Sequence, residues 1–219
     1  MKFIDRELKK REKNRRIQQF SSINWPIKKE EIVSTFNEFN QLFSGSNIEF
    51  DITTSLNSDL SDKYYVGYDV VQIGFPFRWT GNQVVTTTDE QVKMDHKSEQ
   101  GPTLVISTSK LGIINVILMP SKNDDKIIEV ESLLLFTTND PNDLTKAKVE
   151  KFLSQFVVFQ RVDSLFELAS FRERLYIKWL YFFDARKRQK AQSILFNFTN
   201  HWAAVLLSAL AAWFIAKST

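Results

Sequence analysis

Cysteine is absent from the 219-residue chain, and histidine and glycine are scarce, with two and six copies. Without cysteine the chain has no disulfide, thiol nucleophile or cysteine-ligated metal, which fits a reducing compartment. Six glycines leave little room for a glycine-rich phosphate-binding loop. The sequence also holds no GxxxxGK[ST], GxGxxG, HExxH or GxSxG pattern. These absences exclude the commonest catalytic motifs, and we expect a binding protein that is not an enzyme.

The two histidines offer little catalytic chemistry. His201 lies in an apolar C-terminal segment, so a zinc site or a catalytic triad would depend on His96. Asp89 and Asp95 lie close to His96 in sequence, a set that can in principle bind a metal. However, residues 89–100 are crowded with polar side chains, which is more typical of a solvated loop. We therefore predict no catalytic residue, no metal site and no cofactor.

Charge is distributed unevenly along the chain, although the net charge is only +3. Residues 1–16 hold eight Lys/Arg and three Asp/Glu, and residues 172–190 hold seven and two, whereas residues 17–171 carry a net charge of −8. Basic segments bind nucleic acid in some proteins. Here one of the two basic ends adjoins an apolar segment, and anionic lipid attracts such juxtamembrane cations. Contact with lipid is therefore the simpler account.

The C-terminal segment 194–216 contains no charged side chain when His201 is neutral. At about 1.5 Å per residue, a helix of this length spans about 34 Å, enough to cross a hydrocarbon layer of about 30 Å. Trp202 and Trp213 lie near the two ends of its apolar run, as interfacial rings do. We predict that residues 191–219 form a single transmembrane anchor; a buried core helix is the alternative.

The flanking charges predict the orientation of this anchor. Four cations precede the segment and Lys217 alone follows it, and an excess of Lys and Arg marks the cytoplasmic side. We expect a tail-anchored protein with a cytosolic N-terminal domain, in the inner membrane if the organism is bacterial. We predict that two basic clusters contact the membrane surface: Arg186, Lys187, Arg188 and Lys190, together with Lys9, Lys10 and Arg11.

A stripe of small residues suggests that the anchor self-associates. Its members are spaced four apart and therefore lie on one side of a helix: Asn200, Ala204, Ser208, Ala212 and Ala216. Small residues let helices approach closely in lipid, and a polar Asn can hydrogen-bond across the interface. We predict a homo-oligomer, and several copies with inward polar groups could line a pore. Chance is the alternative, because alanine is common in membrane spans.

Residues 25–190 have the length and composition of one α+β domain. Trp25-Pro26 predicts a helix start near residue 27, with an end near Gly45. Alternating and β-branched stretches, joined by connections too short for parallel crossovers, predict an antiparallel sheet of about five or six strands. We expect this sheet to be flanked by the N-terminal helix and by two C-terminal helices, followed by the transmembrane helix. The expected strands are 48–52, 64–79, 83–93, 103–110, 113–119 and 126–138, with a turn at 80–82; the C-terminal helices start at 141 and after 164.

The stretch 175–183 is almost entirely apolar or aromatic, with Lys178 as its one charge. Packing against the sheet is the interpretation that we favour. The alternative is a helix at the lipid surface, with aromatic rings in the interface and Lys178 extending toward the headgroups.

The basic arm, residues 1–24, is compatible with a solvated charged helix, with attraction to the bilayer, or with nucleic-acid binding. The whole pattern favours a single-pass membrane-anchored protein whose cytosolic domain senses a ligand or partner protein and whose span self-associates. By analogy of layout, this suits a gated membrane-disrupting effector in bacterial stress or phage (antiviral) defence. The alternatives are a passive scaffold that recruits a soluble protein to the bilayer, and a membrane-tethered nucleic-acid-binding module.

Overall fold

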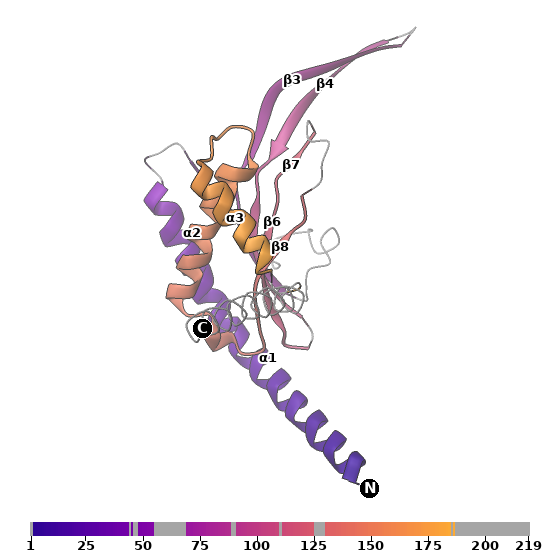
Figure 1. The fold of residues 1–219 in the computed structure, drawn as a ribbon, viewed down its shortest axis with the longest axis vertical. Helices are drawn as coiled ribbons and strands as arrows, with labels where there is room; N and C mark the ends of the chain where they lie inside the picture. The colour runs from indigo at the N-terminus through magenta and orange to yellow at the C-terminus, as the bar shows by residue number, and fades with distance from the viewer. Residues whose placement is uncertain are drawn as a thin grey trace, which may run out of the picture.

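The chain has an α+β architecture in which helices cover one face of an antiparallel sheet (Figure 1). The computed structural model describes residues 2–43, 45, 48–54, 69–88, 91–109, 111–124, 130–184 and 186. The predicted transmembrane anchor, residues 191–219, lies outside the described residues. The described elements, in chain order, are α1 (Lys2–Phe43), β1 (Asp51–Thr54), β2 (Asp69–Gly74), β3 (Phe77–Thr88), β4 (Gln91–Gln100), β5 (Thr103–Thr108), β6 (Ile114–Met119), β7 (Lys122–Asn123), β8 (Leu133–Thr138), the 3-10 helix η3 (Pro141–Asp143), α2 (Lys146–Asp163) and α3 (Phe171–Phe182).

The strands form two sheets, where the sequence predicts one. Five strands pair in the order β1-β2-β5-β6-β8, and three pair in the order β3-β4-β7, with every described pairing antiparallel. The predicted strand 64–79 is interrupted after Gly74, where the chain passes from the larger sheet to the smaller one. At this corner the Phe75 N–H donates to the Pro102 carbonyl at 3.2 Å. A side chain at Gly101 would lie 2.4 Å from the Phe75 Cβ, so the two crossing segments require a glycine there.

β3 and β4 form one long hairpin, and the turn predicted at residues 80–82 is wrong. The three residues lie within β3, where the register with β4 shifts between Trp79 and Gln83. Gly81 has φ +82°, a conformation that glycine adopts without steric cost. The Thr80 hydroxyl donates to the Lys97 carbonyl at 3.1 Å and so keeps this bulge against β4. The region 91–100 is correspondingly a strand and not the solvated loop that its polarity suggests.

α1 begins at Lys2, so the predicted helix start near residue 27 is also wrong. Pro26 lies inside a continuous helix, although an internal proline removes a hydrogen bond and costs about 3 kcal/mol. Tertiary contacts of the residues just before the proline offset this cost. Ser21 is hydrogen-bonded to the β5–β6 turn, and the Trp25 indole is buried and bonded to Asp69. The predicted end is confirmed, because the helix stops at Phe43.

The core lies between the larger sheet and the helices and is rich in phenylalanine. Phe50, Phe75 and Phe156 meet with ring centroids 4.8–6.0 Å apart, and each is buried. β6 shows why the sequence predicted its strand: Ile114, Val116 and Leu118 are fully buried, and the residues between them are only partly so. Each such side chain contributes about 1.5–3 kcal/mol relative to exposure.

The C-terminal helices begin at side-chain caps. Thr145 caps α2 by accepting from the Lys148 N–H, and Ser170 and Glu173 form a capping box at the start of α3. The helix start predicted at residue 141 is a separate 3-10 helix, η3, and α2 follows it. α3 begins at Phe171, later than the start predicted after residue 164.

Core packing, the favoured interpretation of the apolar stretch 175–183, accounts for part of this helix. Ile177 is buried, and three neighbours pack partly against the core: Tyr176, Leu180 and Tyr181. Leu175 and Trp179, in contrast, are 57% and 59% exposed. Core packing therefore explains one side of α3 and leaves the other apolar and exposed.

Candidate functional site

The N-terminal half of α1 projects away from the rest of the molecule (Figure 1). We call residues 2–20 the helical arm. Most of its apolar side chains are exposed, with Phe3 at 77% and Phe20 at 66%. Monomeric proteins rarely expose clusters of large apolar side chains, and such surfaces commonly bind partners. The arm is therefore the first candidate interaction surface.

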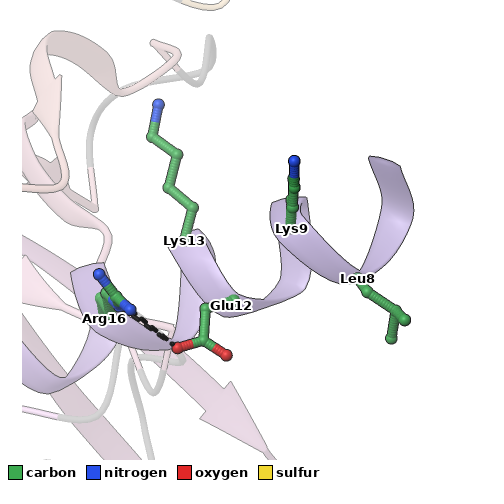
Figure 2. A pocket seen from close by; sticks show the side chains of 5 residues that line it. All are labelled: Leu8, Lys9, Glu12, Lys13 and Arg16. Carbon is green, nitrogen blue, oxygen red and sulfur yellow. Dashed lines mark hydrogen bonds and ion pairs between the residues drawn. The ribbon is translucent and has the colours of Figure 1, made fainter. Parts of the chain in front are cut away.

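Charge dominates the middle of the helical arm. Lys9, Lys13 and Arg16, together with Leu8 and Glu12, line an open depression of about 400 Å³. Figure 2 shows these side chains along the helix. Glu12 accepts from Arg16 at 3.1 Å, and Glu7 pairs with Arg11 at 3.5 Å. Exposed pairs of this kind contribute little to stability. An open helix surface with paired charges suits contact with a larger molecule better than enclosure of a small ligand.

The β3–β4 hairpin, here called the hairpin arm, projects from the opposite end of the molecule (Figure 1). Phe77 and Trp79 meet edge to face at 5.0 Å, and His96 lies 5.7 Å from the Trp79 ring. Trp79 is 62% exposed despite these contacts. Further exposed apolar side chains continue along the arm: Val84, Val85 and Met94. This aromatic and aliphatic surface is the second candidate interaction surface.

A buried carboxylate fixes the base of the hairpin arm. Glu99 is 2% exposed, and its Oε2 accepts from the Asn123 side chain and from the Leu165 N–H, each at 3.1 Å. The contacts join β4 to β7 and to the segment between α2 and α3. Arg78, the cross-strand partner of Glu99, lies 5.9 Å over the Phe166 ring. The hairpin arm is thus firmly attached at its base, while its far part carries the exposed apolar residues.

A polar cleft of about 620 Å³ lies at the base of the helical arm. Its central carboxylate, Asp69, accepts from the Trp25 indole at 2.8 Å and from Lys29 at 2.7 Å. Because both carboxylate oxygens are hydrogen-bonded, Asp69 anchors α1 to β2. The other lining residues are mostly hydroxyls and amides: Gln18, Gln19, Ser21, Ser22, Thr108 and Ser109, with Pro26 and Gly112. Such a lining suits a small polar ligand.

Two of the residues that line this cleft, Ser21 and Gly112, approach each other closely. The Ser21 hydroxyl donates to the Gly112 carbonyl at 3.1 Å. Gly112 has φ +75°, and a Cβ there would lie 2.8 Å from the Ser21 Cβ. Only glycine fits both the turn and the contact. The arrangement fixes the helical arm relative to the β5–β6 turn.

A second charged contact connects α3 to the sheet. Asp184 accepts from the Leu134 N–H at 3.1 Å and from Arg186 at 2.8 Å. Burial opposes ionisation of Asp184, but hydrogen bonds from Arg186 and from Leu134 outweigh it, so its pKa lies below the usual range. Burial raises the pKa of Tyr181 to about 12. Its neutral hydroxyl donates to the Glu131 carbonyl at 2.7 Å.

The predicted site residues are distributed as follows. Lys9, Lys10 and Arg11 are exposed on the helical arm, and Arg186 is half-exposed beside Asp184. The rest of the second basic cluster and the self-association stripe lie outside the described residues: Lys187, Arg188, Lys190, Asn200, Ala204, Ser208, Ala212 and Ala216. Within the described part of the chain, His96 belongs to no group of metal-binding side chains.

Sequence reasoning missed the residues that form the cleft and the hairpin arm. Asp69 is the first residue of β2, and its bonds reach back 40 and 44 residues to Lys29 and Trp25. No local pattern encodes such a contact. Trp79 gave a usable signal, because a tryptophan flanked by Arg78 and Thr80 is unusual for a buried strand.

Comparison of the chain with protein-family models, with curated proteins and with solved structures finds no match. Among the helices that the structure describes, none is long and apolar enough to cross a membrane.

Proposed function

We propose that this chain is a single-pass membrane-anchored protein that works by binding partner proteins through its two arms. The observation that carries the proposal is the exposure of large apolar side chains on both arms, exemplified by Phe20 and Trp79. The uncharged segment 194–216 supplies the anchor, and the basic residues before it set the cytosolic orientation of the domain.

The polar cleft supports a sensing role for the cytosolic domain. It lies where α1 leaves the larger sheet, between Trp25, Asp69 and Ser109. A small polar ligand in this position would contact both the helical arm and the sheet. Ligand binding would therefore change how firmly the helical arm is held, and so its availability to a partner.

The stripe of small residues in the anchor supports self-association in the membrane. Together with ligand sensing, self-association would make the protein a gated effector that disrupts a membrane on a stress or phage signal. The test is induced expression with a dye-entry assay for membrane integrity. We expect permeabilisation by the native chain, and its loss in Ala204→Leu and Ser208→Leu at equal abundance. Intact membranes at high expression, with retention of a partner protein, would favour the passive scaffold.

The binding role of the arms has its own experiment. The full chain is purified in detergent, and co-purifying molecules and subunit number are measured by native mass spectrometry. We expect bound protein that is lost in Phe20→Ser and in Trp79→Ser. Lys146→Ser, which removes an exposed ion pair with Glu38, is the matched control and should retain the partner. Retention in both arm variants would contradict the proposal.

A nucleic-acid-binding module is the second candidate, because Lys9, Lys10 and Arg11 are exposed on the projecting helical arm. Neutralised phosphates release counterions, so such binding weakens steeply with salt. Oligonucleotide binding with this salt dependence, lost in Lys9→Gln/Lys10→Gln/Arg11→Gln, would favour it. The exposed Phe3 and Phe20 on the same arm fit a protein partner better.

A further inference from the structure

The outward side of α3 is apolar, although an exposed helix surface is ordinarily polar. Phe171, Leu175 and Trp179 are spaced four apart, and at about 100° per residue they lie within roughly one quarter of the helix circumference. They are 78%, 57% and 59% exposed. Ile177, the buried residue of this helix, points away from them into the core. The helix therefore has two apolar sides, and no described element of the fold covers the outward one.

Cations flank this outward apolar side. Arg172, Arg174 and Lys178 are exposed, and by helical position they lie to its two sides. Glu173 is the one acidic residue of α3. It accepts from the Ser170 cap and from Arg161 at 2.7 Å, which draws it toward α2. The outward side thus presents aromatic and aliphatic groups bordered by positive charge.

The segment before α3 adds further exposed apolar side chains. Leu168 is 95% exposed, and Leu165 and Phe166 are also exposed. At the other end, the Phe183 ring meets Trp179 at 4.5 Å and remains partly exposed. We call this set the α3 outer surface: Leu165, Phe166, Leu168, Phe171, Leu175, Trp179 and Phe183. Exposed apolar side chains gathered on one helix and its flanking residues indicate an interaction site with protein or membrane.

The charges decide between a second copy of the chain and a lipid surface. In a two-fold symmetric dimer the same patch faces itself, so Arg172, Arg174 and Lys178 would approach the same cations of the other copy. Like charges at close range oppose that arrangement. An anionic bilayer offers the complement: headgroups for the cations and a hydrocarbon boundary for the rings between them.

The position of α3 in the chain supports the same occupant. The helix ends at Phe182, and the uncharged segment starts at residue 194. The eleven residues between them reach at most about 40 Å even when extended. If that segment crosses the bilayer, as proposed above, α3 is tethered close to the membrane surface.

We propose that the α3 outer surface docks onto an anionic lipid bilayer, with Leu175 and Trp179 at the level of the headgroups and Arg172, Arg174 and Lys178 on lipid phosphates. This inference rests on the proposed membrane anchor. Docking requires no unfolding, because Ile177 and the residues beside it stay packed against the core. It gives the cytosolic domain a fixed orientation instead of free rotation on a tether.

The cysteine-free sequence allows a direct test in the full chain. Leu175→Cys and Leu42→Cys are each labelled with an environment-sensitive fluorophore and reconstituted into vesicles containing phosphatidylserine. Leu42 is 82% exposed on α1 and serves as the matched control. We expect nitroxide-labelled lipid to quench the label at Leu175 about threefold more than the label at Leu42, as interfacial insertion predicts. Arg172→Glu/Arg174→Glu/Lys178→Glu in the Leu175→Cys background should reduce this quenching to the control level.

The outcomes separate the docking proposal from the anchor on which it rests. If the chain separates from the vesicles in a density gradient and does not float with them, the membrane anchor itself is contradicted. A chain that co-floats with vesicles but shows equal, weak quenching at both labels retains the anchor and overturns docking. The fluorescence emission of the Leu175 label could instead shift to the blue without quenching by the labelled lipid, and this shift could reverse when the chain is diluted into empty lipid. That result would identify a second copy as the occupant and would also overturn docking. Circular dichroism of each variant verifies that the helices remain folded.

Discussion

The core of the body and the two arms place apolar side chains in opposite environments. In the body, formed by the larger sheet with α2, α3 and the second half of α1, Phe36 and Phe156 are completely buried. In the arms, Phe20, Phe77 and Trp79 are more than half exposed. The same residue type therefore stabilises the fold in one region and is exposed to solvent in the other. Under the proposed function, the difference separates positions that set stability from positions that set binding.

The largest change in the free energy of unfolding is expected for a substitution in the body. Phe156 is fully buried and contacts Phe50 and Phe75, so Phe156→Ala removes these contacts and leaves a cavity. We expect the free energy of unfolding to fall by about 3–5 kcal/mol. Denaturant titration of the full chain in one detergent measures it. The matched change Phe20→Ala, on the exposed arm, should cost no more than about 0.5 kcal/mol. Equal losses would erase the distinction between body and arm.

The next effect is expected at the junction of the two regions. Asp69→Ala removes the carboxylate that accepts hydrogen bonds from both Trp25 and Lys29. The Lys29 ammonium then stays beside the sheet and has lost this carboxylate partner. A fully buried pair broken in this way costs about 3–5 kcal/mol. Asp69 keeps some exposure, so we expect roughly 2–3 kcal/mol on the same argument.

Thermal or denaturant unfolding measures this loss, with Asp51→Ala as the control because Asp51 is an exposed carboxylate on β1. Protease cleavage within residues 2–20 should also become faster in Asp69→Ala. An Asp69→Ala protein as stable as the Asp51→Ala control would show that the arm is held by other contacts.

The body was more predictable from sequence than the arms. β5 and β6 were expected almost at their observed bounds, because the buried alternation of β6 and the turn at Gly112 between the two strands are local signals. Pro26 misled the helix prediction because the contacts that outweigh it, at Ser21 and Trp25, join residues far apart in sequence. Propensity describes a segment alone, and tertiary contacts override it.

The hairpin arm and the division into two sheets also depend on tertiary contacts that local sequence does not reveal. Gly81 has the residue type of a turn, yet it forms a bulge because β4 pairs on both sides of it. The division of the strands into two sheets depends on the close crossing of Phe75 and Gly101. The outward side of α3 was partly predictable, since the aromatic content of residues 175–183 exceeds what one buried side needs.

A smaller change in the free energy of unfolding is expected when the pH is lowered, through Asp184 at the contact between α3 and β8. The pKa of Asp184 lies below its ordinary value in the folded chain, so its contribution to stability is fully present above about pH 4 and is lost as the pH falls through the folded pKa. Asp184→Asn removes this titration. Between about pH 5 and about pH 3, a range that spans the ordinary Asp pKa, we expect its free energy of unfolding to change less than that of the native chain.

Denaturant titrations at a series of pH values give this slope, and Asp51→Asn is the control. An acid dependence in Asp184→Asn that equals that of the native chain would mean that Arg186 and Leu134 do not hold the carboxylate as the structure indicates.

The smallest effect on stability, and the most informative for function, is expected at Trp79. Its ring is 62% exposed and contacts only Phe77 and His96 among the aromatic residues described. Trp79→Ala should therefore change the free energy of unfolding by no more than about 0.5 kcal/mol. The same substitution should abolish partner binding, because exposed aromatic anchors dominate the energy of interfaces. Parallel denaturation and pull-down measurements test both statements. Lost stability with retained binding would place Trp79 with Phe156 as a structural residue and would reverse the assignment of the hairpin arm.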